Sequence, residues 1–184
     1  GPLYHFSRDQ KPGDVLGQGV NALGGLWFVV SPYGGPRQTQ AIVSLTQQPG
    51  YGGVLSDASG RTLYLATNDQ PNKTNCLSAT SDRWPALLTI APPVAGTGVT
   101  GSLLGTTKRE EGSTQVTYNG WPLYYFNRDT RAGDTAGQAL VDDCGAWYVV
   151  SAAGAAVTAS APAAPAALPR TGSGGLSPDD ENGG

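Results

Sequence analysis

The sequence contains an internal repeat. The segment PLYHFSRDQKPGDVLGQ at residues 2–18 returns as PLYYFNRDTRAGDTAGQ at residues 122–138, and residues 1–34 align with residues 121–154 without a gap. The copies lie about 120 residues apart and share Tyr, Asp, Gly and Trp positions, which indicates a duplication rather than an accident of composition. A chain of this kind must build its fold from copies of one local structure.

A third and weaker copy lies between these two. RTLYLATND at residues 61–69 aligns with GPLYHFSRD and WPLYYFNRD, and ALLTI at residues 86–90 aligns with LWFVV at residues 26–30 and AWYVV at residues 146–150. The period is therefore about 60 residues. We call the three copies the first, second and third half-repeats, at about 1–34, 53–91 and 114–154.

Each half-repeat has the pattern of a hairpin, a long polar loop and a closing strand. TQVTY at 114–118 and PLYYF at 122–126 flank Asn119-Gly120, and Asn-Gly between alternating apolar residues is the strongest short hairpin signal. The closing strands LWFVVS and AWYVVS are β-branched and aromatic, as strands prefer. We therefore expect one all-β domain over residues 1–154, an antiparallel sandwich or distorted barrel of repeated hairpin–loop–strand units.

The first half-repeat begins in the middle of its hairpin. Gly1 aligns with the residue that follows the turn glycine of the third half-repeat, so the chain reads as a piece of a longer repeat protein. The strand at residues 2–6 then needs a partner. AIVSL at 41–45 or LLGTTKR at 103–109 could supply it, and an open edge also favours self-association with another copy.

Composition excludes several classes of function. The net charge is −3 with no basic stripe, which argues against nucleic acid as a partner. No apolar run is long enough to span a membrane. One histidine, His5, and two cysteines cannot supply the four ligands of a zinc site. Cys76 and Cys144 form either a disulfide or two buried free thiols, and no cofactor is predicted.

Tyrosines and aspartates recur in register. The tyrosines could line a binding groove, but a tyrosine beside a hairpin turn more often buries its ring and hydrogen-bonds its hydroxyl. The aspartates each end a strand, where a carboxylate usually accepts backbone N–H bonds. We expect all six to be structural: Tyr4, Asp9, Tyr64, Asp69, Tyr124 and Asp129.

The loops that follow the aspartates offer a second interpretation. Their carboxylate and amide oxygens suit calcium, which takes about 6–8 oxygen ligands, although the spacing matches no known calcium loop. Asn21 and the Asp142-Asp143 pair could add ligands, although the pair is more simply solvated. The candidate cation loop consists of Asp14, Gln18, Asp134 and Gln138.

Trp121 is the best candidate for contact with a ligand. It follows the Asn-Gly turn and is replaced by Gly1 and Arg61 in the other half-repeats, so we expect an exposed indole at a hairpin tip. Trp27 and Trp147 lie in apolar strands and are expected in the core. No catalytic residue is predicted, because His5 does not recur and no serine has a visible His/Asp partner.

The motifs LYxFxxD, GDxxGQ and GxWYVVSxxG together resemble the secreted repeat of unknown function. That family is found in bacterial lipoproteins and is marked by a Tyr-x-aromatic-x-x-Asp motif. The resemblance covers about 1–34 and 53–154 and implies a secreted, surface-located domain. The family has no established activity, so the resemblance implies a location more than a chemistry.

The resemblance also bears on the cysteines. In the family a Cys-x3-Cys pair usually precedes Trp-Pro, whereas here Cys76 and Trp84-Pro85 are present and Thr80 replaces the second cysteine. Cys144 takes the place of Gly24 of the first half-repeat. This departure implies a rewired bridge, Cys76–Cys144.

The composition changes after residue 154. Residues 155–184 are rich in Ala, Pro and Gly and are expected to form a disordered tail. The tail holds LPRTG, which resembles the LPxTG sorting signal by which sortase links surface proteins to the Gram-positive cell wall. The hydrophobic segment that usually follows is not in this sequence. The sorting motif consists of Leu168, Pro169, Arg170, Thr171 and Gly172.

These patterns favour a non-enzymatic module on the cell surface, anchored to the wall, with a role in adhesion, scaffolding or presentation of an unidentified ligand. Two alternatives remain open. One is a lipoprotein domain that binds a small ligand or a metal through the Asp and Gln loops. The other is an uncharacterised hydrolase.

Overall fold

The computed structural model describes residues 3–18, 20–22, 25–30, 39–76 and 82–158. Regular structure in this part of the chain consists of short strands and one turn of 3-10 helix, η2 (Gly101–Leu103), and it includes no α-helix. None of its helices is long and apolar enough to cross a membrane. The all-β class expected from the sequence is confirmed.

The strands form small sheets rather than one continuous one. Three sheets have three strands each, in the orders β4-β3-β6, β7-β8-β9 and β10-β11-β5, and a fourth pairs β1 with β2. All pairs are antiparallel except β3 with β6. The sheets are not closed into a barrel. The strands are β1 (Asn21–Ala22), β2 (Gly25–Leu26), β3 (Ile42–Gln48), β4 (Gly52–Asp57), β5 (Tyr64–Ala66), β6 (Val94–Ala95), β7 (Leu104–Lys108), β8 (Thr114–Tyr118), β9 (Trp121–Pro122), β10 (Val141–Asp142) and β11 (Gly145–Val149).

The hairpin expected at Asn119-Gly120 is present. It joins β8 to β9, with Tyr118 paired with Trp121. Asn119 and Gly120 have φ angles of 49° and 81°, and a two-residue turn of the favoured type needs positive φ at both of its central positions. Asn tolerates this conformation better than most residues, which explains why an asparagine precedes the glycine in this turn.

Residues 3–6 form no strand in the structure, and the partners expected for a strand at residues 2–6 were wrong. Residues 42–45 belong to β3, which pairs with β4 and β6. Residues 104–108 form β7, which pairs with β8. Each segment has a hairpin partner close by in the sequence, and a short loop costs less entropy to close than a long one.

The core has two parts, which β5 separates. Residues 63–66 are all buried, and their side chains alternate between the two faces as in any strand. Tyr64 and Ala66 face an aromatic cluster that also holds Trp84, Tyr124, Phe126 and Trp147. Leu63 and Leu65 face an aliphatic cluster that also holds Val43, Leu55, Leu87, Val116, Leu123 and Val150.

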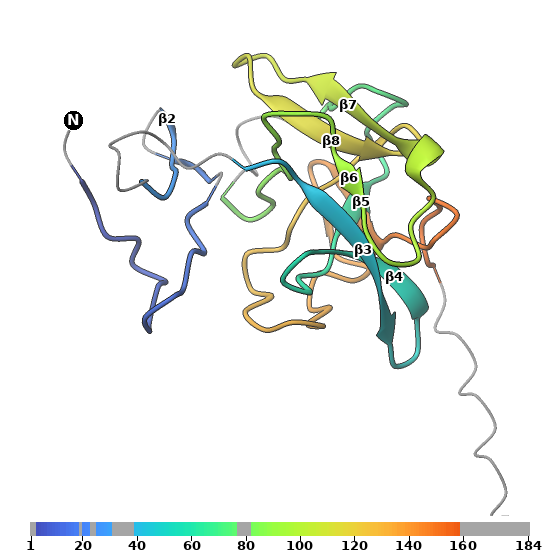
Figure 1. The fold of residues 1–184 in the computed structure, drawn as a ribbon, viewed down its shortest axis with the longest axis horizontal. Helices are drawn as coiled ribbons and strands as arrows, with labels where there is room; N and C mark the ends of the chain where they lie inside the picture. The colour runs from blue at the N-terminus through green and yellow to red at the C-terminus, as the bar shows by residue number, and fades with distance from the viewer. Residues whose placement is uncertain (1–2, 19, 23–24, 31–38, 77–81, 159–184) are drawn as a thin grey trace, which may run out of the picture.

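The first half-repeat lies apart from this core. Figure 1 shows its blue trace to one side of the sheets formed by β3, β4, β7 and β8. Its apolar residues Leu3, Tyr4 and Val30 are exposed, whereas the equivalent residues of the third half-repeat are buried. The paired core is therefore built from the second and third half-repeats with the segments 39–52 and 92–113.

The hydrogen-bonded body extends three residues beyond the expected domain boundary. The Ser151 N–H donates to the Ala155 carbonyl, and the Val157 N–H donates to the Val149 carbonyl. Val157 also packs against the aromatic cluster. LPRTG and the rest of the tail from residue 159 lie outside the described residues.

Candidate functional site: reciprocal tyrosine–aspartate pairs beside a disulfide

The second and third half-repeats meet at their motif tyrosines. Tyr64 and Tyr124 form an antiparallel bridge in which each backbone N–H donates to the carbonyl of the other residue, at 2.8 and 2.9 Å. β5 and the segment that holds Tyr124 therefore pair at equivalent residues. A contact between equivalent positions of two similar units produces an arrangement close to twofold symmetry.

The side chains exchange partners across this bridge. The Tyr64 hydroxyl donates to Asp129 Oδ2 at 2.6 Å, and the Tyr124 hydroxyl donates to Asp69 Oδ2 at 2.7 Å. Each half-repeat thus places its tyrosine on the aspartate of the other, and all four residues are buried. Hydrogen bonds to a buried carboxylate are among the stronger ones in proteins, so these reciprocal pairs hold the two half-repeats together.

The other oxygen of each aspartate closes the loop of its own half-repeat. Asp129 Oδ1 accepts the N–H of Ala136 at 2.9 Å. Asp69 Oδ1 accepts the N–H groups of Asn75 and Cys76 at 2.7 and 3.2 Å. One carboxylate therefore serves two functions: it orders a local loop and it binds a distant tyrosine.

The environment of the pairs keeps the tyrosines protonated. Burial raises the pKa of Asp129 to about 6, against the lowering effect of the hydrogen bonds from Tyr64 and Ala136. Burial also raises the pKa of Asp69, and it raises the pKa of Tyr64 and Tyr124 far above the usual tyrosine value. A tyrosine with a raised pKa acts as a hydrogen-bond donor rather than as a base or nucleophile, which favours a structural role for the motif.

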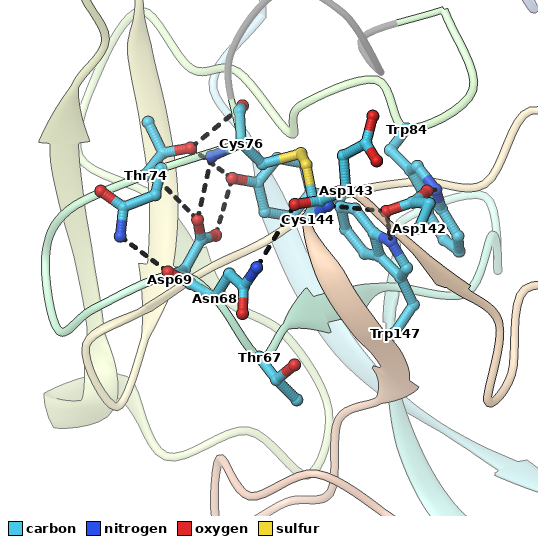
Figure 2. Close-up of a disulfide and its surroundings, with 12 residues drawn as sticks. Thr67, Asn68, Asp69, Thr74, Cys76, Trp84, Asp142, Asp143, Cys144 and Trp147 are labelled. Carbon is cyan, nitrogen blue, oxygen red and sulfur yellow. Dashed lines mark hydrogen bonds between the residues drawn. A yellow bond between two sulfur atoms is a disulfide. The ribbon is translucent and has the colours of Figure 1, made fainter.

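A disulfide connects the same two half-repeats. Cys76 and Cys144 are bonded, with their Cα atoms 5.3 Å apart, which is the pairing that the family resemblance implied. The bridge spans 68 residues, and a loop of that length constrains the unfolded chain by about 4 kcal/mol. Figure 2 shows the disulfide between the Asp69 loop on one side and the two tryptophans on the other.

Two tryptophans stack beside the disulfide and share one acceptor. The rings of Trp84 and Trp147 are 3.9 Å apart and nearly parallel. The indole N–H of Trp84 donates to Asp142 Oδ2 and that of Trp147 donates to Asp142 Oδ1, at 2.9 and 2.8 Å (Figure 2). The Cys144 N–H also donates to Asp142. This carboxylate therefore joins the tryptophan stack to the disulfide.

The oxygens of the candidate cation loops bind backbone N–H groups. Asp14 accepts the N–H groups of residues 10 and 11, and Asp134 accepts those of residues 130 and 131. The Gln18 and Gln138 carbonyl oxygens accept the N–H groups of residues 29 and 149, both at 2.8 Å. Within the described ranges, no three His, Cys, Asp or Glu side chains gather where they could hold a metal ion.

The remaining candidates lie at separate places. Trp121, in β9, is half-buried and packs against the aliphatic cluster. His5 is exposed on the first half-repeat. The structure therefore brings together the motif residues of the second and third half-repeats, but not Trp121 or the residues of the first half-repeat.

An open cleft of 320 Å³ lies where the first half-repeat approaches the core. Phe28 of the first half-repeat lines it together with Gln40, Leu88 and Tyr125. The Tyr125 hydroxyl donates to Asp57 at 3.1 Å. This cleft offers apolar and polar groups to a small ligand.

Two stretches of the chain match a family model. Residues 1–31 and 105–151 match the model of a family described as a secreted repeat of unknown function. The chain has no significant match among curated proteins or among solved structures. The secreted repeat has no assigned role or catalytic activity, and the disulfide agrees with an extracellular location.

The family match covers only part of the residues that form the site. It covers Tyr124 and Asp129, but Tyr64 and Asp69 lie outside both matched stretches. The structure adds the second half-repeat, whose tyrosine and aspartate complete the reciprocal pairs. In this chain the third half-repeat buries its motif residues against the second half-repeat.

Sequence reasoning did not predict the structural roles of Asp142, Trp84 and Arg109. Asp142 aligns with Asp82 of the second half-repeat but with Ala22 of the first, and Trp84 aligns with Gly24 and Cys144. A shared acceptor for two indole N–H groups is needed only where a second tryptophan is present. The joint occurrence of Asp142 and Trp84 was therefore the sequence signal that could have predicted this contact. Arg109 is buried and donates to Gln115, whose amide donates to the Leu123 carbonyl, and no repeat pattern marks it.

Proposed function

We propose that this chain is a non-enzymatic module of the bacterial cell surface, attached to the wall through LPRTG and active in adhesion, scaffolding or ligand presentation. The observation that carries the proposal is the burial of the motif residues. Tyr64, Asp69, Tyr124 and Asp129 hydrogen-bond one another in the core. The motif thus builds a scaffold and leaves the outer surface to contact partners.

The tail supplies the attachment. Residues 159–184 hold LPRTG after a run of Ala and Pro, a composition that suits an extended spacer. The disulfide supports a location outside the cell, where such bonds persist. Sortase and the cell wall are therefore the first partners that we propose.

A transpeptidation assay tests the attachment. The full chain is incubated with a purified Gram-positive sortase and a fluorescent triglycine peptide. We expect cleavage between Thr171 and Gly172, with the peptide joined to Thr171 and residues 172–184 released. Thr171→Ala and Leu168→Ala should abolish the product, and Ser173→Ala is the matched control in the same tail. A wild-type chain that stays intact contradicts wall attachment.

A binding assay tests the surface role. The wild-type chain is immobilised through its tail and exposed to peptidoglycan fragments, wall polysaccharides and extracellular matrix proteins. We expect saturable binding to one of these classes that survives Tyr64→Phe, since the motif is internal. Trp121→Ala probes the candidate contact residue, and Tyr148→Phe is the control. Absence of binding to every class contradicts an adhesive role.

A second candidate is a small-ligand binding function in the cleft lined by Phe28, Gln40 and Tyr125. The open volume of 320 Å³ favours it. A ligand that fills such a site at about 100 times its Kd stabilises the fold by about 2.7 kcal/mol. Thermal unfolding with a library of polar small molecules, and with calcium against EDTA, would reveal this as a raised Tm. Gln40→Ala should remove the shift if the cleft is the site.

A further inference from the structure

We propose that the first half-repeat is an interaction surface for the first half-repeat of a second copy of this chain. In the resulting dimer, Tyr4 of each copy donates to Asp9 of the other. The paired second and third half-repeats provide the template. The proposal is independent of wall attachment.

The first half-repeat already has the local structure of a paired one. Asp9 Oδ1 accepts the Leu16 N–H at 2.9 Å, as Asp129 Oδ1 accepts the Ala136 N–H. The Tyr4 and Trp27 rings are 5.4 Å apart, as the Tyr124 and Trp147 rings are 5.1 Å apart. The loop that positions the aspartate and the ring that supports the tyrosine are thus both in place.

The contact of a loop glycine with a phenylalanine is similar in the first and third half-repeats. A Cβ on Gly17 would lie 2.8 Å from Phe6, and a Cβ on Gly137 would lie 3.0 Å from Phe126. The Gly137 N–H donates to the Tyr64 hydroxyl at 3.3 Å, so this loop forms part of the receptor for the incoming tyrosine. The first half-repeat presents the same receptor in Asp9 and Gly17.

The cross-contacts are what the first half-repeat lacks. Tyr4 is 70% exposed against 1% for Tyr124, and Leu3 is 75% exposed against 0% for Leu123. Within the described part of the chain, no tyrosine hydroxyl donates to Asp9, and the Leu3 and Tyr4 backbone N–H groups have no acceptor. An exposed apolar segment with open N–H groups can pair with another chain, as the open edge of a sheet does.

The second and third half-repeats cannot serve as the partner. Tyr64, Asp69, Tyr124 and Asp129 already bind one another and are tied by the disulfide. A second copy, however, offers an identical open half-repeat. The reciprocal exchange is self-complementary, because each half gives one tyrosine and receives one, and this is the requirement of a twofold interface.

The template also sets the register. Tyr64 and Tyr124 exchange both backbone hydrogen bonds, so in an antiparallel pair the residues before one tyrosine face those after the other. Two first half-repeats aligned in this way pair Tyr4 with Tyr4 of the second copy. Leu3 of each copy then faces His5 of the other.

Sedimentation of the full chain over a range of concentrations tests the association. We expect a reversible monomer–dimer equilibrium. Tyr4→Phe should raise the dimer Kd about 100-fold, because a symmetric interface loses two hydrogen bonds to carboxylates. Asp9→Asn should weaken it to a similar degree. Tyr148→Phe, in β11 of the paired core, should change the Kd less than about twofold. A chain that stays monomeric, or a dimer that Tyr4→Phe leaves unchanged, overturns the proposal.

Disulfide trapping tests the register. The native cysteines are already bonded to each other, so an introduced cysteine is the reactive thiol. A mixture of Leu3→Cys and His5→Cys chains under mild oxidation should give mainly the mixed dimer, because directly opposed Cβ atoms in such a pair lie within disulfide reach. A Ser7→Cys chain replaces one partner as the control. Equal yields of all dimer combinations overturn the register.

Discussion

Leu3 and Leu123 occupy the same position in two copies of one unit, yet Leu3 is largely exposed and Leu123 is fully buried. The two copies share the aspartate-capped loop and the tyrosine–tryptophan contact. They differ because the third half-repeat pairs with another half-repeat at its tyrosine, whereas the first does not within the described residues. The comparison shows that the recurring sequence specifies a loop and a strand locally, whereas burial of the motif requires another half.

The disulfide gives the largest contrast, because it occurs only in the paired halves. Removing it with Cys76→Ser and Cys144→Ser together should destabilise the core by about 4 kcal/mol, since the bridge spans 68 residues. Urea unfolding followed by tryptophan fluorescence measures this. Ser78→Ala, two residues after Cys76 in the sequence, is the control. A loss below about 1 kcal/mol would mean that the reciprocal pairs hold the halves together without the bridge.

The two leucines give a direct comparison of one substitution in two environments. Leu123→Ala should cost about 3 kcal/mol, because it leaves a cavity in the aliphatic cluster. Leu3→Ala should cost less than about 0.5 kcal/mol in the monomer, because the side chain is exposed. Chemical denaturation at a concentration where the chain is monomeric measures both. Equal costs would contradict the difference in burial.

The stability contributed by Asp129 should depend on pH more strongly than that contributed by Asp9. The folded-state pKa of Asp129, about 6, lies above its unfolded value of 3.8. The folded protein therefore binds this proton more readily, and the resulting stability is complete below about pH 4 and lost as the pH rises through 6. The advantage of the wild type over Asp129→Asn should shrink by at most about 3 kcal/mol between pH 4 and pH 7.

The measurement is chemical denaturation at intervals across that range. At a concentration where the chain is monomeric, Asp9→Asn is the matched control, because Asp9 is then exposed and caps only its own loop. An advantage of the wild type over Asp129→Asn that grows with pH would contradict the raised pKa of the buried carboxyl.

Asp142 should have a smaller effect that depends on the tryptophan stack. Asp142→Ala leaves the indole N–H groups of Trp84 and Trp147 without their acceptor, at a cost of about 2 kcal/mol. The adjacent Asp143→Ala, which removes an exposed carboxylate, is the control. Thermal unfolding with near-UV circular dichroism reports both the stability and the stack. Identical behaviour of the two variants would contradict the role of Asp142.

The sequence alone predicted the local structure well. The Asn119-Gly120 hairpin followed from turn chemistry, and the expectation that a tyrosine beside a turn buries its ring holds for Tyr64 and Tyr124 but not for Tyr4. The partners of residues 2–6 were wrong, because β3 and β7 each have a nearer hairpin partner. Recurrence of a motif does not reveal which copies meet in space.

The exchange across the half-repeats was beyond sequence reasoning for the same reason. A tyrosine and an aspartate five residues apart suggest a contact within one unit, whereas the hydroxyl of Tyr64 binds Asp129 of another unit. Trp84 does not recur and Asp142 recurs only as Asp82, so the pattern shared by all three copies did not single them out. The repeated sequence determines the local structure of each half-repeat. The contacts that pair two half-repeats come partly from residues outside the repeated motif.

A double-mutant cycle on Tyr64 and Asp129 tests the central claim most directly. Tyr64→Phe, Asp129→Asn and the double variant are unfolded in urea beside the wild type, and the same cycle is measured on Tyr4 and Asp9 with the chain monomeric. The reciprocal-pair account predicts a coupling energy of about 1.5–3 kcal/mol for Tyr64 with Asp129 and a value near zero for Tyr4 with Asp9. A Tyr64–Asp129 coupling below about 0.5 kcal/mol, or equal couplings in the two cycles, would contradict it.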